Sequence, residues 1–431
     1  MESKQICIAI MTLIFSMQLI SAYNLQYIGN FTASHPGFLS LIRTQDTGRI
    51  NDDYSLFVSS FNGAPFTTDH VYFVPAIGTV VQTFQSNGHH TVKHTTLSSN
   101  IVWPNEVNQV PDDVFGKKMM SIAGGFLVPL KTKGSIRLVD LSTGTPQRPT
   151  EMTTGSDDHH WFYHRILWLD MNGDGKKDAV TCRAKKSLLG SGTGQLVWYE
   201  HPQTDSISNP WHHFIIADHS DTFFDITTLT TPTGTNTVIV TTGFFSNQLK
   251  IYWTTDPSGK WTDTLKIKSR VIEEHIGHVF DVQIDDVNND GKSDLLVTSN
   301  GLSNTAVYVY EIPADFRTQT FTRHTIMTGF KSHNLLPGGG APGSAKTIRN
   351  PSINNGKPLI LLSGDDDSHA YILNAVSESV SDWSYHSNKI LDTKSGTVGG
   401  ITSHDIDGDG NLEIFVPAYS NNLIHIFKLL P

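Results

Sequence analysis

The chain has 431 residues, a formal net charge of −10 and a hydrophobic fraction of 38%. This length suits two or three ordinary domains or one large all-β body, and the hydrophobic fraction is sufficient for a sizeable core. The acidic balance argues against a nucleic-acid partner, because phosphate binding requires a basic surface.

Residues 1–22 predict a signal peptide. An apolar run from Ile6 to Ile20 follows Lys4, and small residues near Ala22 favour cleavage there. The run is shorter than a membrane-spanning helix needs, and no later stretch is both long and apolar enough to span. We therefore expect a secreted, extracellular chain of residues 23–431 without a membrane anchor.

Cysteine usage excludes an intrachain disulfide in the mature chain, because Cys7 leaves with the signal peptide and Cys182 remains alone. Cys182 lies in an apolar, strand-like run, so we expect it to be a buried small hydrophobe. The segment Asn30-Phe31-Thr32 is a glycosylation sequon. The sequence leaves open whether Asn30 carries a glycan.

Three acidic segments share one pattern. Residues 170–178, DMNGDGKKD, carry acidic or amide side chains at places one, three, five and nine and glycine at place six, as an EF-hand loop begins. The pattern returns at 286–294, DVNNDGKSD, and at 405–413, DIDGDGNLE. An EF-hand needs a glutamate at place twelve, where this chain has Thr181, Val297 and Val416. Because β-rich runs flank each segment, we interpret the three as strand–loop–strand units.

The acidic segments belong to a longer repeat of about four short strands. Similar strand patterns without the acidic loop lie between them and towards the N-terminus. We predict seven units, which begin near residues 37, 116, 164, 222, 279, 344 and 398. Four short strands repeated seven times indicate a β-propeller.

Ring closure is predicted from the two ends of the chain. The last unit lacks a fourth strand, and the segment NLQYIGNFT, residues 24–32, has no unit of its own. The N-terminal segment can therefore supply the missing strand, and a closed ring leaves no long open sheet edge. We predict an all-β fold, a single seven-bladed β-propeller over residues 23–431 with four-stranded blades, closed by the N-terminal strand.

The loop pattern D-x-[DN]-x-D-G-x-x-[DE] between strands resembles the FG-GAP/VCBS repeats, which occur in integrin α-subunit heads and in many secreted propellers. The resemblance implies about three structural Ca²⁺ sites. In the first loop the implied ligands are Asp170, Asn172, Asp174, Asp178 and the carbonyl of Lys176. In the second they are Asp286, Asn288, Asp290, Asp294 and the carbonyl of Lys292. In the third they are Asp405, Asp407, Asp409, Glu413 and the carbonyl of Asn411.

The chemistry of these loops supports calcium independently of the resemblance. Several carboxylates within nine residues repel one another unless a cation is present, and hard oxygen ligands at alternate places suit Ca²⁺. A plain acidic turn is the alternative. We expect the ions to brace blades rather than to sense calcium.

Histidines gather just before several predicted inner strands. They are His35, His159, His160, His219, His278 and His333. They are either turn residues hydrogen-bonded to nearby backbone, or parts of a polar funnel in which imidazole serves as metal ligand or general acid/base. In the second interpretation the candidate catalytic residues are His160, His219, His278 and His333, with a second metal of unknown identity at the funnel. Neighbouring acids are then candidates for orienting the rings or sharing the metal: Asp157, Asp158 and Asp218.

Segments such as IVWPNEVNQVPDDVFG, residues 101–116, are also similar to secreted sugar-active propellers, including the propeller domain of fungal aldos-2-ulose dehydratase. This resemblance implies a carbon–oxygen lyase that eliminates water or an alkoxide from a sugar, with the funnel histidines as acid and base and Arg165 or Arg183 as charge partners. Tryptophans either stack on a sugar or pack blades. These are Trp103, Trp161 and Trp211.

Two functions stay open from the sequence. The first is an extracellular module, expected to be a monomer, that binds a glycan or another protein. The second is a carbohydrate-active lyase or dehydratase. Histidines that meet one another or a shared metal would favour the enzyme, and scattered histidines bonded to local backbone would favour the binding module.

Overall fold

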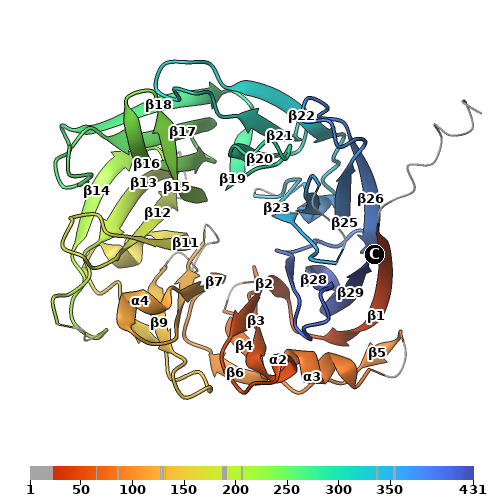
Figure 1. The fold of residues 1–431 in the computed structure, drawn as a ribbon. Helices are drawn as coiled ribbons and strands as arrows, with labels where there is room; N and C mark the ends of the chain where they lie inside the picture. Colours follow the sequence, from red (N-terminus) through yellow and green to blue (C-terminus); the bar gives the residue numbers. More distant parts are fainter. Residues whose placement is uncertain are drawn as a thin grey trace, which may run out of the picture.

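A computed structural model describes residues 23–431 except positions 65, 85–86, 127, 129–130, 132, 187–191, 205–206, 336–337 and 353–355. The predicted signal peptide, residues 1–22, lies outside the described residues. Seven antiparallel sheets surround a central axis, as Figure 1 shows. The predicted seven-bladed β-propeller is therefore confirmed.

Six blades are each built from four strands that pair in chain order, with the first strand of each nearest the axis (Figure 1). The first blade has β2 (Pro36–Arg43), β3 (Tyr54–Ser60), β4 (His70–Val74) and β6 (Thr95–Ser98), and the second has β7 (Pro104–Val110), β8 (Met119–Gly124), β9 (Ile136–Asp140) and β10 (Thr150–Glu151). The third has β11 (Phe162–Leu169), β12 (Asp178–Lys186), β13 (Gly192–Tyr199) and β14 (His213–Asp218), and the fourth has β15 (Phe224–Thr231), β16 (Gly234–Gly243), β17 (Gln248–Thr254) and β18 (Ile267–Glu274). The fifth has β19 (His278–Asp285), β20 (Asp294–Asn300), β21 (Ala306–Glu311) and β22 (Thr322–Thr328), and the sixth has β23 (Ala345–Ile348), β24 (Leu359–Ser363), β25 (His369–Ala375) and β26 (Tyr385–Asp392).

The seventh blade closes the ring as predicted. Its strands β27 (Thr402–His404), β28 (Leu412–Ala418) and β29 (Leu423–Leu430) are completed by the N-terminal strand β1 (Asn24–Thr32). β1 runs antiparallel to β29, with Asn24 opposite Leu430. A two-residue strand, β5 (His89–His90), adds to the outer side of β1 in parallel. The fifth strand was not expected from the sequence.

One predicted boundary is wrong. The second blade begins with β7 at Pro104, not near residue 116, which lies between its first and second strands. The sequence of β7 is PNEVNQV, in which polar residues interrupt the apolar–polar alternation that identifies a strand. Asn105 and Glu106 are nevertheless buried, because this strand faces the central axis and its polar groups find partners there.

The second strands of the blades form the apolar interior. All residues of β20 and of β28 are buried, because each second strand is covered by neighbouring blades on both faces. Cys182 in β12 is fully buried, as expected, and burial raises the pKa of its thiol well above the ordinary value. The helices are short and lie in connections: α2 (Ile50–Asp53), α3 (Ile77–Gln82), α4 (Asp112–Phe115) and the 3₁₀ turns η1 (Asp158–His160), η2 (Asp365–Asp367) and η3 (Tyr419–Asn421). Within the described part of the chain, no helix is both long and apolar enough to cross a membrane.

The antiparallel order gives the propeller two distinct ends. Each first strand begins at one end of the axis, and the loop to the second strand lies at the other end. The three acidic segments connect first to second strands, namely β11 to β12, β19 to β20 and β27 to β28. They therefore lie at the end opposite to the starts of the inner strands, with strands and no helices on either side.

Candidate functional site

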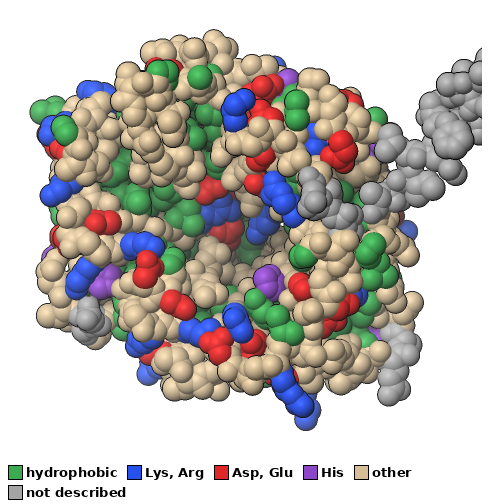
Figure 2. All heavy atoms as spheres, in the orientation of Figure 1, with side chains coloured by type: hydrophobic (Ala, Val, Ile, Leu, Met, Phe, Trp, Pro, Cys, Tyr) green, Lys and Arg blue, Asp and Glu red, His purple; other side chains and the backbone are tan. Residues whose placement is uncertain are grey.

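A pocket of about 350 Å³ lies on the axis at the end where the inner strands begin. Figure 2 shows the opposite end of the axis, on the side of α2 and α4, where the central hollow contains acidic and basic side chains. Aromatic side chains from several blades line most of the pocket. They are Phe38, Phe61, Trp103, Phe126, Phe162, Phe244, Phe245, Phe280 and Tyr419. Mostly apolar walls with a few polar groups are typical of small-ligand sites.

Three of the rings form a continuous stack along one wall. The Trp103 ring lies 4.3 Å from the Phe61 ring and 4.9 Å from the Phe126 ring, centroid to centroid, with both pairs stacked. Trp103 has a positive φ of 45°, which is unusual for a bulky residue. Asp69 holds this backbone by accepting a hydrogen bond from the Trp103 N–H at 2.8 Å, and Lys131 pairs with Asp69 at 2.6 Å. The buried ion pair thus fixes the ring that forms the centre of the wall.

Two buried polar side chains lie in the pocket with unused hydrogen-bonding capacity. The amide nitrogen of Asn105 donates to Gly125 O and Tyr163 O, but its Oδ1 has no hydrogen-bond partner in the described structure. His164 is 3% exposed, and neither ring nitrogen has a partner among the described residues. Burial lowers the pKa of His164 to about 4, so the imidazole is neutral near pH 7. Buried polar groups of this kind normally have a hydrogen-bond partner, such as another protein group, an ordered water or a ligand.

The acidic side of the pocket is formed by Asp365 and Asp366 of η2. Asp366 accepts hydrogen bonds from Thr397 Oγ1 at 2.6 Å and from the Gly340 N–H at 3.1 Å. Asp365 accepts one long bond of 3.4 Å from Asn300 Nδ2. Burial, together with the charge of Asp366, raises the pKa of Asp365 well above its ordinary value. The described residues that line the pocket include no lysine or arginine.

A charged network crosses the axis next to the pocket. Arg165 makes a bidentate contact with Glu106, at 2.8 and 2.9 Å, and lies 3.2 Å from Asp281. Burial acts to raise the pKa of Glu106, but the charge and hydrogen bonds of Arg165 outweigh it and lower the pKa to about 2. A second cavity of about 510 Å³ lies on the other side of this network and is lined by Arg165, Glu106, Asp225 and Lys346, among others. The network therefore forms a charged floor between two axial cavities.

The four candidate catalytic histidines are exposed, and none of them lines the central pocket. His278 Nδ1 bonds the Phe244 carbonyl at 2.7 Å, and the His333 N–H donates to the Asp366 carbonyl. His160 and His219 are held by backbone bonds, to Asp157 and Gly194 respectively. None of the four belongs to a group of three or more potential metal-ligating side chains in the described residues. The structure thus does not bring them together.

The remaining candidates near these histidines have structural partners. Arg183 and Asp158 form a fully buried ion pair at 3.2 Å. His35 bonds Ser34 and Asn62, and His159 lies 3.5 Å from Glu151. The other acids are also occupied: Asp157 accepts from Trp161 Nε1 and Asp218 accepts from Gln195 Nε2. Of the three predicted tryptophans, Trp103 lines the pocket, while Trp161 and Trp211 are buried in the core between blades.

The three acidic loops share one hydrogen-bonding geometry. At the first place, Asp170, Asp286 and Asp405 each accept a bond from the N–H of the glycine five residues later, at 2.8–2.9 Å. At the ninth place, a carboxylate accepts from the N–H of the second loop residue. These bonds join Asp178 to Met171, Asp294 to Val287 and Glu413 to Ile406. The repeated geometry holds the carboxylates on the inside of each turn.

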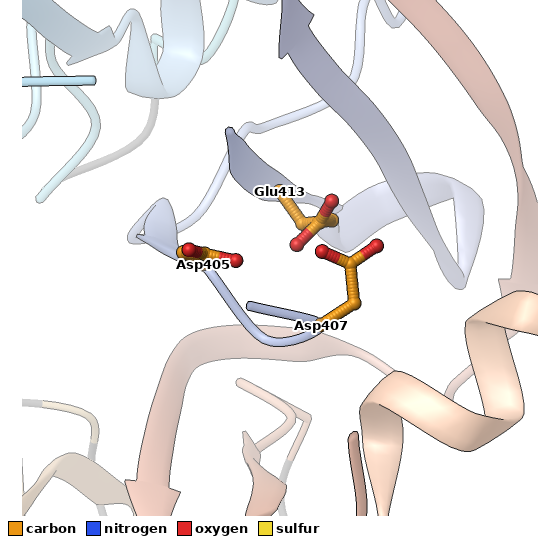
Figure 3. Close-up of side chains that lie close together, drawn as sticks. All are labelled: Asp405, Asp407 and Glu413. Atoms are coloured by element: carbon orange, nitrogen blue, oxygen red, sulfur yellow. The ribbon is translucent and has the colours of Figure 1, made fainter. Parts of the chain in front are cut away.

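The third loop gathers carboxylates most closely. Asp405, Asp407 and Glu413 offer ligand oxygens within 4.8 Å of one another, and Figure 3 shows the three side chains facing a common space. Lys428 of β29 reaches into this cluster, with Nζ 2.7 Å from Asp407, 2.8 Å from Asp409 and 2.7 Å from Glu413. Burial opposes the charge of Lys428, but the hydrogen bonds to these acids outweigh it and raise its pKa. The donor set fits Ca²⁺, and the ammonium group already neutralises part of it.

The first two loops contain no such close trio, because Asn172 and Asn288 stand where the third loop has Asp407. No cation among the described residues pairs with their ninth-place acids, Asp178 and Asp294. Burial raises the pKa of Asp178 to about 6 and that of Asp294 to about 7. A divalent cation would offset the cost of burying these two carboxylates in ionised form, so both loops also suit Ca²⁺.

No protein-family model and no curated protein matches the sequence. The resemblance of the loops to FG-GAP/VCBS repeats therefore remains a prediction. Among solved structures the chain is similar to the Dos1 propeller, with 12% identity, a TM-score of 0.46, and 87% of this chain and 76% of that chain covered. It is also similar to the NanB sialidase of Streptococcus pneumoniae, with 10% identity, a TM-score of 0.42, and 97% of this chain and 72% of that chain covered. A glucose dehydrogenase is similar too, with 9% identity, a TM-score of 0.42, and 78% of this chain and 98% of that chain covered. At these values the likenesses add nothing about function.

The sequence did not reveal most of the pocket. Its aromatic residues come one or two at a time from six of the seven blades and show no motif, and Asp365 lies in a loop without the acidic repeat pattern. His164 is next to Arg165 in an apolar strand, four residues beyond His160. The available signal was its position near the start of an inner strand, where a side chain can face the axis.

Proposed function

We propose that this chain is a secreted, calcium-braced binding module that takes its ligand at the central pocket, as a small molecule or as a group presented by an extracellular glycan or protein. The aromatic pocket on the axis carries this proposal. It lies at the end where loops from several blades converge, and its apolar walls surround a small number of polar groups, as ligand sites do.

Calcium has a structural part in this proposal. The acidic loops lie at the end of the axis opposite to the pocket, so an ion bound there would not touch the ligand. Each ion would instead join a first strand to a second strand at the base of a blade. The repeated loop geometry and the ninth-place carboxylates of the first two loops, which pair with no cation among the described residues, support this role.

The arrangement of histidines favours binding over catalysis. A lyase needs a base and an acid close to one substrate, but His160, His219, His278 and His333 lie outside the pocket and bond local backbone. His164 is the imidazole that lines the pocket among the described residues. No particular observation favours the lyase, so binding is the function proposed.

A pocket-filling variant tests the proposal. Gly63 lines the pocket, and a Cβ at this position would meet Trp103 at 4.0 Å, an ordinary contact. We expect Gly63→Leu to fold and to fill part of the pocket. The control is Gly259→Asn, at a turn of the opposite end with φ of 75° and open space around it, where asparagine is tolerated.

The measurement is saturation-transfer NMR with a panel of glycans and small organic molecules. We expect at least one panel member to bind the parent protein and the Gly259→Asn variant, and to lose binding in Gly63→Leu. Binding that is unchanged in Gly63→Leu would place the ligand elsewhere. A panel without any binder would contradict the proposed pocket.

A further inference from the structure

We infer that the ligand of the central pocket carries an organic ammonium group, which would lie between the carboxylate of Asp365 and the aromatic wall. This inference rests on the proposed function of the pocket and deepens it by naming the ligand's chemical class. It is carried by the charge, the rings and the free hydrogen-bond acceptors of the pocket.

The charge argument concerns the missing countercation. Several buried acids of this chain have one, as in the pairs Asp69–Lys131, Glu106–Arg165 and Asp158–Arg183, whereas Asp178, Asp221 and Asp294 do not among the described residues. Half-buried Asp365 and buried Asp366 have no ion pair among the described residues, and the described residues that line the pocket include no lysine or arginine. Burying a carboxylate without a partner is costly. A cationic ligand would supply the missing charge.

The aromatic argument concerns the faces of the rings. Elsewhere the chain places its own cations over aromatic rings, as Arg183 and Lys185 lie 4.5 and 4.1 Å from the Trp161 ring centroid. The stacked pocket rings Phe61, Trp103 and Phe126 have no such cation among the described residues. Ring faces attract desolvated organic cations, quaternary ammonium groups in particular. The wall and the carboxylates therefore favour the same kind of ligand.

The available acceptors argue against other ligand classes. Asn105 Oδ1 and one nitrogen of His164 would accept hydrogen bonds, so a purely apolar ligand would leave them without partners. A neutral sugar would satisfy acceptors but, unlike a cation, would not favour the ionised form of Asp365, whose pKa burial raises. A metal ion is disfavoured because both oxygens of Asp366 already accept hydrogen bonds, and no trio of metal-ligating side chains occurs here among the described residues. An organic ammonium ion with a hydroxyl or N–H donor would pair with Asp365, lie against the aromatic rings and donate a hydrogen bond to Asn105 Oδ1 or His164.

The test compares charged probes with neutral isosteres. Isothermal titration and NMR would measure binding of choline and phenethylamine, and of the analogues in which carbon or oxygen replaces the charged nitrogen. The variant Asp365→Asn removes the charge and keeps the shape, and asparagine suits the positive φ of 54° at this position. The control Asp112→Asn removes an exposed negative charge from α4 at the opposite end of the axis.

We expect at least one ammonium probe to bind the protein roughly tenfold more tightly than its neutral isostere. Asp365→Asn should remove most of this preference, whereas Asp112→Asn should keep it. Equal binding of probe and isostere would overturn the ammonium inference and leave the pocket as a binding site. A second outcome would also overturn the ammonium inference and leave the pocket as a binding site. In that outcome neither ammonium probe binds, but another ligand of the panel binds the parent protein and loses binding in Gly63→Leu. If no ligand of any class binds, the proposed function fails as well.

Discussion

Lys428 provides the sharpest test of the proposed calcium sites. Its ammonium group contacts the carboxylates of Asp407, Asp409 and Glu413 in the third acidic loop. Lys428→Met keeps an unbranched, flexible side chain and removes the charge. Three acids are then left with no ammonium group between them, and Ca²⁺ becomes the available replacement.

The size of the effect follows from burial. Removing one partner of a buried ion pair costs about 3–5 kcal/mol. The side chains of Lys428 and Glu413 are 14% and 2% exposed, but that of Asp409 is 45% exposed, so we expect the lower end, about 3 kcal/mol, without calcium. Ca²⁺ at about one hundred times its dissociation constant would restore about 2.7 kcal/mol.

The assay is urea unfolding followed by tryptophan fluorescence, with excess chelator or with excess Ca²⁺. Lys428→Met should widen the stability gap between the two conditions relative to the parent protein. The control is Lys394→Met, which removes a lysine that is 86% exposed and paired with Asp392, and should cost less than about 1 kcal/mol in both conditions.

Two results would refute this reasoning. If Lys428→Met is equally unstable with chelator and with Ca²⁺, the loop does not accept the ion in place of the ammonium group. If the variant is as stable as the parent protein in chelator, Lys428 does not neutralise the loop.

Three further predictions concern stability, each measured by urea unfolding. Arg165→Met should lower the free energy of unfolding by about 3–5 kcal/mol, because Glu106 and Asp281 lose their partner. Adding Glu106→Gln to this variant should recover part of the lost stability. An Arg165→Met variant as stable as the parent protein would contradict the role given to the charged floor. Burial raises the pKa of Asp221 to about 7, so its protonated carboxyl stabilises the folded protein at low pH. This stability should be lost as pH rises through 7, and the free energy of unfolding should fall by about 2–3 kcal/mol between about pH 5 and about pH 8. Asp221→Asn should reduce this slope, and an unchanged slope would assign it to other groups. Phe31→Ala, which removes a ring of β1 that is 1% exposed, should cost about 3–5 kcal/mol; a loss below about 1 kcal/mol would show that β1 is dispensable.

The sequence predicted the ring because its signals are local. Each acidic segment shows its turn chemistry within nine residues, and the strands beside it are apolar and short. The predicted start of the second blade near residue 116 was wrong because the local signal is missing there. Where an inner strand such as β7 faces the axis, its polar residues are satisfied by partners on other blades, for example Glu106 by Arg165, and the local pattern disappears.

The candidate site could be predicted only in part for the same reason. The loop carboxylates are neighbours in sequence, but Lys428 lies fifteen positions after Glu413 and reaches the loop through strand pairing of β28 with β29. The pocket combines Trp103 with Asp365, which belong to different blades. Their proximity is a property of ring closure and cannot be read from spacing along the chain.

The pairing of β1 with β29 also has a consequence for how the molecule is made. Asn24 lies opposite Leu430, so β1 has no strand to pair with until β29 has been synthesised. Six blades can assemble before β29 is synthesised, whereas the seventh is complete only when β1 pairs with β29, about four hundred residues later in the chain. Such long-range pairing is slow. An intermediate with an open gap, and with β29 exposed to other chains, should therefore precede the native ring.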